Sequence, residues 1–158
     1  MSGAPHSLHV RFVSGKGWDS KVIEWYSRCE WSHVELLFGN VTFGAQLRGG
    51  VKWRKLGDPC YARAVKTETW EIPLTEEEHN VMTKLITDAF GTKYDWPAIL
   101  SFMLGPHRLH LPGAYICSGF VAGLLGGIGK LAINLPIENY DPRDLWVLVP
   151  QIRGARKL

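Results

Sequence analysis

The chain has 158 residues, of which 46% are hydrophobic and 21% charged, a balance that is typical of a globular protein and excludes a disordered or fibrous one. Its formal net charge of +3 is too small to single out nucleic acid, lipid head groups or another anionic polymer as a partner. The length predicts one domain, spanning residues 1–158, with a core of its own.

The first predicted element is a strand over residues 8–13, where apolar and polar side chains alternate. Asp19 or Ser20 is then expected to cap a short helix that turns Tyr26 toward the core. Residues 32–38 predict a second strand.

A two-residue turn at Gly39-Asn40 predicts a hairpin, in which residues 41–47 form the returning strand. The Gly49-Gly50 pair ends that strand, and further strands are expected over residues 51–55 and 63–72. The first half of the chain is therefore expected to be rich in strands.

Helices are expected to dominate the second half. Thr75 and Glu78 form a capping box that starts a helix ending near Phe90, with Gly91 as its stop. The run at residues 95–97 predicts another helix start, because it places a proline in the first turn.

The last part of the chain follows a loop bracketed by Pro106 and Pro112. A helix is expected to begin at Cys117. Turns are expected over residues 139–144, before a short apolar run at residues 145–149. The whole pattern predicts an α+β fold.

The chain is expected to lack a leader and a membrane span. Residues 1–12 have no continuous apolar segment of the kind that signal peptides carry. The most hydrophobic stretch, residues 120–133, is broken by glycines, carries Lys130 and is too short to cross a bilayer. We therefore expect cytoplasmic synthesis, after which a lysis or injection system could deliver the protein to a cell wall or a virion. The oligomeric state stays open.

The three cysteines, Cys29, Cys60 and Cys117, are an odd number without a Cys-x-x-Cys pair, which argues against a disulfide framework and a thiolate zinc site. We expect Cys29 and Cys60 to be structural. Cys117 differs because it stands at a predicted helix start, where unpaired N–H groups and the helix dipole favour a thiolate.

A nucleophilic cysteine needs an imidazole to hold the thiolate and move protons, and His33 on the strand at residues 32–38 is the best candidate. A third polar group would orient that imidazole. Glu35 alternates with His33 and faces the same side, about 6–7 Å along the strand. Gln46, on the returning strand of the hairpin, could accept the ring N–H instead. The hairpin register decides between them, and the sequence does not fix it.

Parts of the chain resemble the NlpC-type cysteine peptidases. Residues 91–96 match a Gly-x-x-Tyr-x-Trp segment, and residues 115–121 are similar to the Asp-Cys-Ser-Gly-hydrophobic segment that follows it in that family. Residues 32–40 resemble the family's histidine strand and turn. The histidine precedes the cysteine here, which is the order of the circularly permuted branch with YiiX-like amidases and lecithin-retinol-acyltransferase-like proteins. The resemblance spans residues 31–55 and 91–125.

This resemblance implies a papain-like core, in which the cysteine helix packs on an antiparallel sheet that carries the histidine. It implies that Cys117 is the nucleophile, that His33 is the general base, and that the backbone N–H of Cys117 helps to form an oxyanion hole. The third polar position of the family falls near Gln46, which we favour slightly over Glu35 as the residue that orients His33. Three residues are expected to contact the substrate: Tyr94, Tyr115 and Ser118.

The resulting functional prediction is a cysteine hydrolase that cleaves an amide bond, in peptidoglycan or a short peptide, through a thioester. An acyltransferase or lipid thioesterase would use the same site with another acceptor. The apolar residues near the cysteine are compatible with acyl chains (Phe102, Met103, Leu104 and Phe120). A third hypothesis is a non-enzymatic binding or structural module, for example in a phage particle.

No cofactor, metal or nucleic-acid partner is expected; the expected partner is a peptide or peptidoglycan-like substrate. His107 and His110 lie in a proline-flanked loop without a nearby acid or thiol, which argues against a metal site. Residues 123–130 lack the spacing of a phosphate loop, and tight helix packing explains their glycines better. No basic stripe interleaves with the tryptophans.

Overall fold

The structure, a computed structural model, describes residues 6–46, 49–95, 97, 113 and 115–158. Some predictions fall outside the described residues. They concern the course of the helix expected to start at residues 95–97, the loop that carries His107 and His110, and the apolar residues Phe102, Met103 and Leu104.

Among the described residues, six antiparallel strands form one sheet in the order β4-β3-β2-β1-β5-β6. The strands are β1 (His6–Gly15), β2 (His33–Phe38), β3 (Val41–Gln46), β4 (Gly50–Lys55), β5 (Ala64–Leu74) and β6 (Arg156–Lys157). The first five confirm the strand predictions, with ends that differ by up to two residues. The last was not predicted, because two residues are too few to show an alternating pattern.

The two faces of the sheet differ because β1, its long central strand, alternates. Leu8, Val10 and Phe12 of β1 are fully buried and form part of the hydrophobic core. Arg11 points to the opposite face, because successive strand residues face opposite sides, and it pairs in register with Glu35 of β2. The sheet therefore has an apolar face and a second face that carries charged residues.

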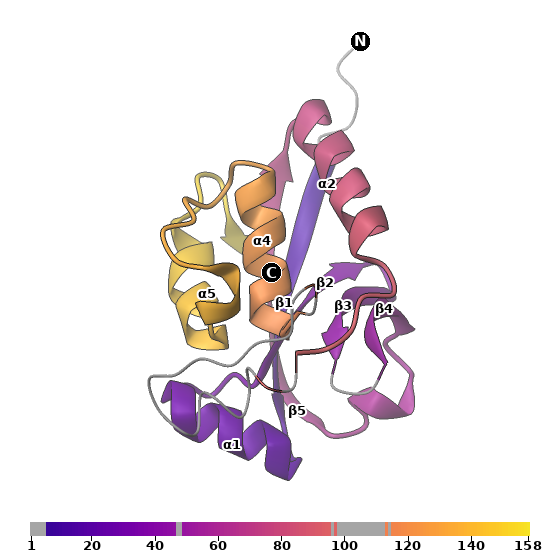
Figure 1. The fold of residues 1–158 in the computed structure, drawn as a ribbon, viewed down its shortest axis with the longest axis vertical. Coiled ribbons are helices and arrows are strands. Elements are labelled where there is room, and N and C mark those ends of the chain that lie inside the picture. The colour runs from indigo at the N-terminus through magenta and orange to yellow at the C-terminus, as the bar shows by residue number, and fades with distance from the viewer. Residues whose placement is uncertain (1–5, 47–48, 96, 98–112, 114) are drawn as a thin grey trace.

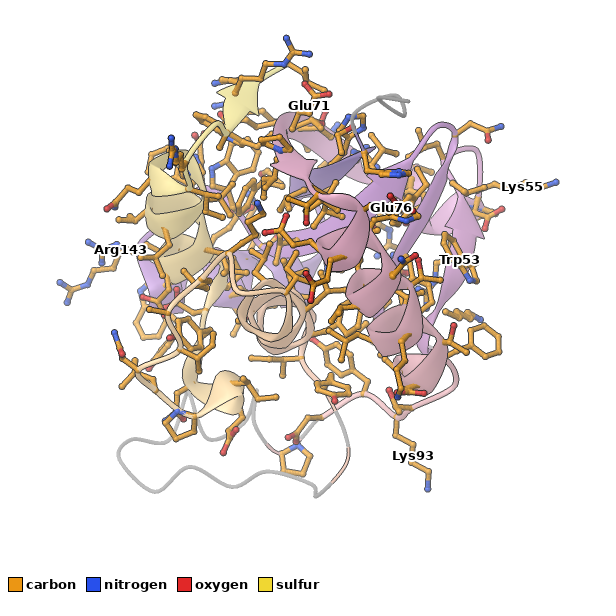
Figure 2. The ribbon with its side chains drawn as sticks, turned by 90° about the horizontal axis from the view of Figure 1, so that it is seen from above. Trp53, Lys55, Glu71, Glu76, Lys93 and Arg143 are labelled. Atoms are coloured by element: carbon orange, nitrogen blue, oxygen red, sulfur yellow. The ribbon has the colours of Figure 1, made fainter. Side chains whose placement is uncertain are left out.

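Helices cover the apolar face, with α4 lying between α2 and α5 in both views (Figure 1, Figure 2). The helices are α1 (Trp18–Ser27), α2 (Glu76–Ala89), α4 (Cys117–Gly127) and α5 (Pro142–Leu148), with single 3-10 turns η1 (Pro59–Tyr61), η2 (Ile137–Asn139) and η3 (Val149–Gln151). Within these described residues, none of the helices is both long and apolar enough to span a membrane.

The α2 prediction is confirmed. Thr75 accepts a hydrogen bond from the backbone N–H of Glu78, and the Glu78 side chain accepts one from the backbone N–H of Thr75. The α1 prediction is wrong at its start, since Gly17 is the N-cap. Tyr26 is also not turned inward, because its side chain is 37% exposed. The α1 helix lies at one end of the sheet (Figure 1).

A helix replaces the turns and apolar run expected near the C-terminus. Asp141 and Asp144 form a reciprocal capping box, and Pro142 occupies the first helical position of α5. The sequence therefore contained a helix-start signal at this point that the turn prediction missed.

Close packing around α4 depends on glycines. A Cβ at Gly119 would lie 2.8 Å from the backbone oxygen of Ile137, and one at Gly127 would lie 2.6 Å from a methyl group of Leu85. These distances are too short for a carbon atom, so the glycines let η2 and α2 approach the helix. The Gly127 contact supports the prediction that the glycines within residues 123–130 serve helix packing.

Candidate active site

Cys117 is the first residue of α4, as predicted, and the extended residue Ile116 forms the N-cap. Its side chain is only 3% exposed, so the thiol lies in the core rather than on the surface. Backbone N–H groups of Ser118, in the same helical turn, and of Val34, on β2, donate hydrogen bonds to the sulfur. Both contacts favour the thiolate, because each brings a positive hydrogen toward the sulfur.

His33 is the first residue of β2, where the strand begins beside the start of α4. Its side chain hydrogen-bonds to Cys117, although 84 positions separate the two residues (117 − 33). Its Nε2 atom lies 3.3 Å from Oε2 of Glu35. This contact favours the tautomer with a hydrogen on Nε2, which leaves Nδ1 to face the thiol.

Burial opposes the charged form of both His33 and Cys117, but the attraction between imidazolium and thiolate outweighs it. The pKa of His33 is raised to about 10 by the Cys117 thiolate, with a smaller contribution from Glu35. The pKa of the Cys117 thiol is lowered by the charge of His33 and by hydrogen bonds. Each group of the pair therefore favours the charged form of the other.

Glu35 supplies the anion on the other side of His33. Its side chain is 1% exposed, and its Oε1 atom accepts a hydrogen bond from Nη1 of Arg11 at 2.9 Å. The hydroxyl of Tyr61 donates to Oε2 at 2.7 Å. Burial raises the pKa of Glu35, but hydrogen bonds from His33 and Tyr61 and the charge of Arg11 bring the net pKa below its ordinary value.

In their charged forms, these four groups make a chain of alternating charge. The order runs from the Arg11 cation through the Glu35 anion and the His33 cation to the Cys117 thiolate. Each charge is adjacent to one of opposite sign, which is the condition under which buried ionised groups are tolerated.

Gln46 lies in the same network but at its far end. Its Nε2 atom donates to the hydroxyl oxygen of Tyr61 at 3.2 Å. The side chain that the structure brings against His33 is therefore Glu35, and Gln46 reaches the imidazole only through Tyr61 and Glu35.

The three residues expected to contact the substrate lie around the start of α4. Tyr94 and Tyr115 form a parallel bridge, which joins the residues after α2 to those before the cysteine. Both are half-buried, and the Tyr115 ring packs edge-on against Phe120. The Ser118 side chain is fully buried and donates to the carbonyl oxygen of Tyr140 at 2.5 Å. A substrate contact by Ser118 would therefore involve its backbone.

Arg11 and Tyr61 belong to the site but were missed from the sequence. Arg11 gave one signal, since a charged residue alternates there with buried apolar ones in a central strand. Tyr61 gave none, because it reaches Glu35 from η1, in the connection between β4 and β5, and no local pattern predicts where such a turn folds back.

In residues 6–46, 49–95, 97, 113 and 115–158, no three His, Cys, Asp or Glu side chains are grouped so that they could hold a metal ion.

No family model matches the chain, and no curated protein matches it. A solved structure does match: a crystal structure of YiiX from Escherichia coli O157:H7, described as a metalloprotein of the DUF1105 family. The TM-score is 0.66 and the identity 15%, over 98% of this chain and 96% of that one. The chain therefore shares the α+β fold of YiiX. The wider NlpC-type, papain-like relationship stays a prediction.

Proposed function

We propose that the protein is a cysteine-dependent hydrolase that cleaves an amide bond of a peptide or peptidoglycan fragment through a thioester. The observation that carries this proposal is the contact of Cys117 with His33 at the start of α4, with Glu35 on the far nitrogen of the imidazole. A nucleophile, a base and a group that orients the base are the parts that cysteine-based acyl transfer needs.

In the first half of the reaction, the Cys117 thiolate attacks the carbonyl carbon of the amide and forms the C–S bond. The carbonyl oxygen becomes an oxyanion. The His33 imidazolium then gives its proton to the amide nitrogen as the C–N bond breaks, so that the amine leaves and a thioester remains.

In the second half, neutral His33 takes a proton from water, and the resulting hydroxide attacks the thioester carbonyl. The C–S bond breaks, the acid product leaves, and Cys117 returns as a thiolate beside the imidazolium. Glu35 stays ionised and keeps the ring in place throughout, because Arg11 and Tyr61 hold both of its oxygens.

The oxyanion is stabilised by the first turn of α4. The first four N–H groups of a helix have no acceptor within the helix, and the backbone N–H of Cys117 is one of them. Such a donor lies next to the atom under attack and points along the positive end of the helix dipole. Loss of one donor of this kind typically costs about 10²–10³ in rate.

The acyltransferase alternative has little support from the described residues. Phe120 packs edge-on against Phe43 and Tyr115 and is 3% exposed, so it is part of the core rather than free to line an acyl-chain site. The other apolar residues considered for that role lie outside the described part of the chain.

The site does not fit a metal ion, although YiiX is described as a metalloprotein. Both oxygens of Glu35 accept hydrogen bonds, and the Arg11 cation lies 2.9 Å from one of them. A metal cation at Glu35 would have to displace these donors and approach the guanidinium charge. No step of the proposed reaction passes through a metal.

The proposal is tested by Cys117→Ala and by the ionisation of the thiol. We expect the variant to keep its circular dichroism spectrum and to lose release of amines from purified peptidoglycan and from a peptide library. The thiolate absorbance of the native protein should persist well below the ordinary thiol pKa of about 8.5 and should disappear in Cys117→Ala. Full hydrolysis by the variant, or an ordinary thiol titration in the native protein, would contradict the proposal.

A further inference from the structure

We propose that Tyr61 is a positioning residue, whose hydroxyl proton fixes the Glu35 oxygen that faces His33, and that Gln46 and Thr42 orient this proton. The inference rests on the proposed function, since it concerns the same cysteine and histidine. It assigns a role to η1, the turn between β4 and β5, which no sequence motif marked.

The Tyr61 hydroxyl lies at the centre of three polar contacts. It donates to Oε2 of Glu35 at 2.7 Å, accepts from Nε2 of Gln46 at 3.2 Å, and contacts the hydroxyl of Thr42. Glu35 comes from β2, and Thr42 and Gln46 from β3, so the turn that carries Tyr61 closes over the polar side of this hairpin.

A count of hydrogens gives the direction of each bond. A phenol has one proton and can accept from two donors, and an ionised carboxylate can only accept. Because Glu35 is ionised, the Tyr61 proton points to Oε2. The amide of Gln46 donates, and the Thr42 hydroxyl must then donate as well. With Gln46 and Thr42 donating to the Tyr61 oxygen, the Tyr61 proton is directed at the carboxylate.

The two oxygens of Glu35 therefore have separate tasks. Oε1 pairs with Arg11, which supplies the counter-charge. Oε2 accepts from both Tyr61 and His33, so the position of this oxygen sets the position of the imidazole. The Arg11 guanidinium also lies over the Tyr61 ring, 5.4 Å from its centre, which holds the ring in place.

A purely structural role for Tyr61 would be to anchor the turn between β4 and β5. The two roles differ in what they predict for Cys117. An anchor affects the free energy of unfolding alone. A positioning residue changes the ionisation of Cys117, because a displaced carboxylate no longer holds the imidazolium that stabilises the thiolate.

The experiment is the pH dependence of Cys117 alkylation by iodoacetamide in the full chain. Trypsin separates the three cysteines, because they fall in the peptides 29–48, 56–63 and 109–130, so mass spectrometry follows each one independently. The thiolate absorbance gives a second titration that does not depend on reagent access. Tyr61→Phe removes only the hydroxyl, and Tyr26→Phe, on the exposed side of α1, is the matched control.

For Tyr61→Phe we expect the midpoint of thiolate formation to move up by about one pH unit and amide hydrolysis to fall roughly tenfold, the size expected for one hydrogen bond to a charged group. Tyr26→Phe should match the native protein. Gln46→Ala should shift the midpoint in the same direction by less, and it keeps the inference testable if Tyr61→Phe does not fold.

The outcomes separate the two proposals. A native protein in which Cys117 titrates as an ordinary thiol overturns the proposed function and this inference together. If the native midpoint is low and Tyr61→Phe leaves it unchanged, the role of Tyr61 is overturned and the proposed function stands. If Tyr61→Phe does not fold, the same conclusion follows when Gln46→Ala leaves the midpoint unchanged.

Discussion

Replacing Glu35 with glutamine removes a charge while keeping the shape of the side chain, so Arg11 and His33 lose the anion that lies between them. At the 3.3 Å separation of His33 Nε2 and Glu35 Oε2, an effective dielectric constant of about 20 gives an attraction of about 5 kcal/mol, which is an upper bound. Solvation offsets much of it, and hydrogen bonds to charged groups contribute about 1.5–3 kcal/mol in mutational series.

On that scale Glu35→Gln should lower kcat/KM roughly 10- to 150-fold and raise the midpoint of Cys117 thiolate formation. The variant should also be less stable, because removing one partner of a buried ion pair costs about 3–5 kcal/mol. That figure is an upper estimate here, since the Arg11 side chain keeps 12% exposure to water.

Chemical denaturation and peptide-resolved alkylation separate these two effects. The double variant Arg11→Met with Glu35→Gln removes the unpaired cation, so it should recover much of the stability and none of the activity. Glu76→Gln, in the first turn of α2 and on the surface in Figure 2, is the charge-matched control. The reasoning is refuted if Glu35→Gln keeps native activity and a native Cys117 titration.

Three further predictions concern His33, the pH dependence of stability and the packing of α4. His33→Asn removes the cation beside the thiol, so the Cys117 alkylation rate at neutral pH should fall at least tenfold; an unchanged rate would show that the helix start alone activates the sulfur. The His33 pKa is raised from 6.5 to about 10, so the contribution of His33 to stability is complete below pH 6.5 and is lost as pH rises through 10. The Cys117 pKa is lowered from 9.0, so the contribution of Cys117 is complete above pH 9.0 and is lost as pH falls. Above 9.0 nothing offsets the loss of the His33 term, so the free energy of unfolding of the native protein should fall as pH rises from 9.0 through 10. Urea titrations across pH on the native protein and on Cys117→Ala measure this decline, and an equal pH dependence in the two proteins would contradict it. Gly119→Ala places a Cβ 2.8 Å from the Ile137 backbone oxygen and should destabilise by about 1–3 kcal/mol in the same assay, while Gly57→Ala, with nothing within 4 Å, should change stability little.

Most of the fold could be predicted because its signals are local. Alternating side chains marked β1 to β5, and the hairpin turn at Gly39-Asn40 appears in the structure with Gly39 at a φ of +61°. The capping box of Thr75 and Glu78 marked the start of α2. The α5 helix was missed although Asp141 and Asp144 carry the same kind of signal, because the helix has only seven residues and its apolar run is short.

The site could be predicted only where a local signal coincided with it. Cys117 stands at a helix start and His33 begins a strand, and both features are visible in the sequence. Arg11 and Tyr61 depend on tertiary contacts, one across the β1–β2 register and the other through a turn that folds back over β3. Local patterns therefore pointed to Cys117, His33 and Glu35, but not to the two residues that hold Glu35.

The point at which the β2–β3 pairing ends determines whether Gln46 can contact His33. The β2–β3 register pairs Phe38 with Val41 and Leu36 with Phe43, and three residues further on it would set His33 opposite Gln46. The paired residues stop at Leu36, and Gln46 contacts Tyr61 instead. The effect on the Cys117 titration should therefore decrease from Glu35→Gln through Tyr61→Phe to Gln46→Ala, because each residue is one hydrogen bond further from His33. Peptide-resolved alkylation measures this order. If Gln46→Ala has the largest effect, the amide itself orients the imidazole, as the resemblance to the NlpC-type family implied.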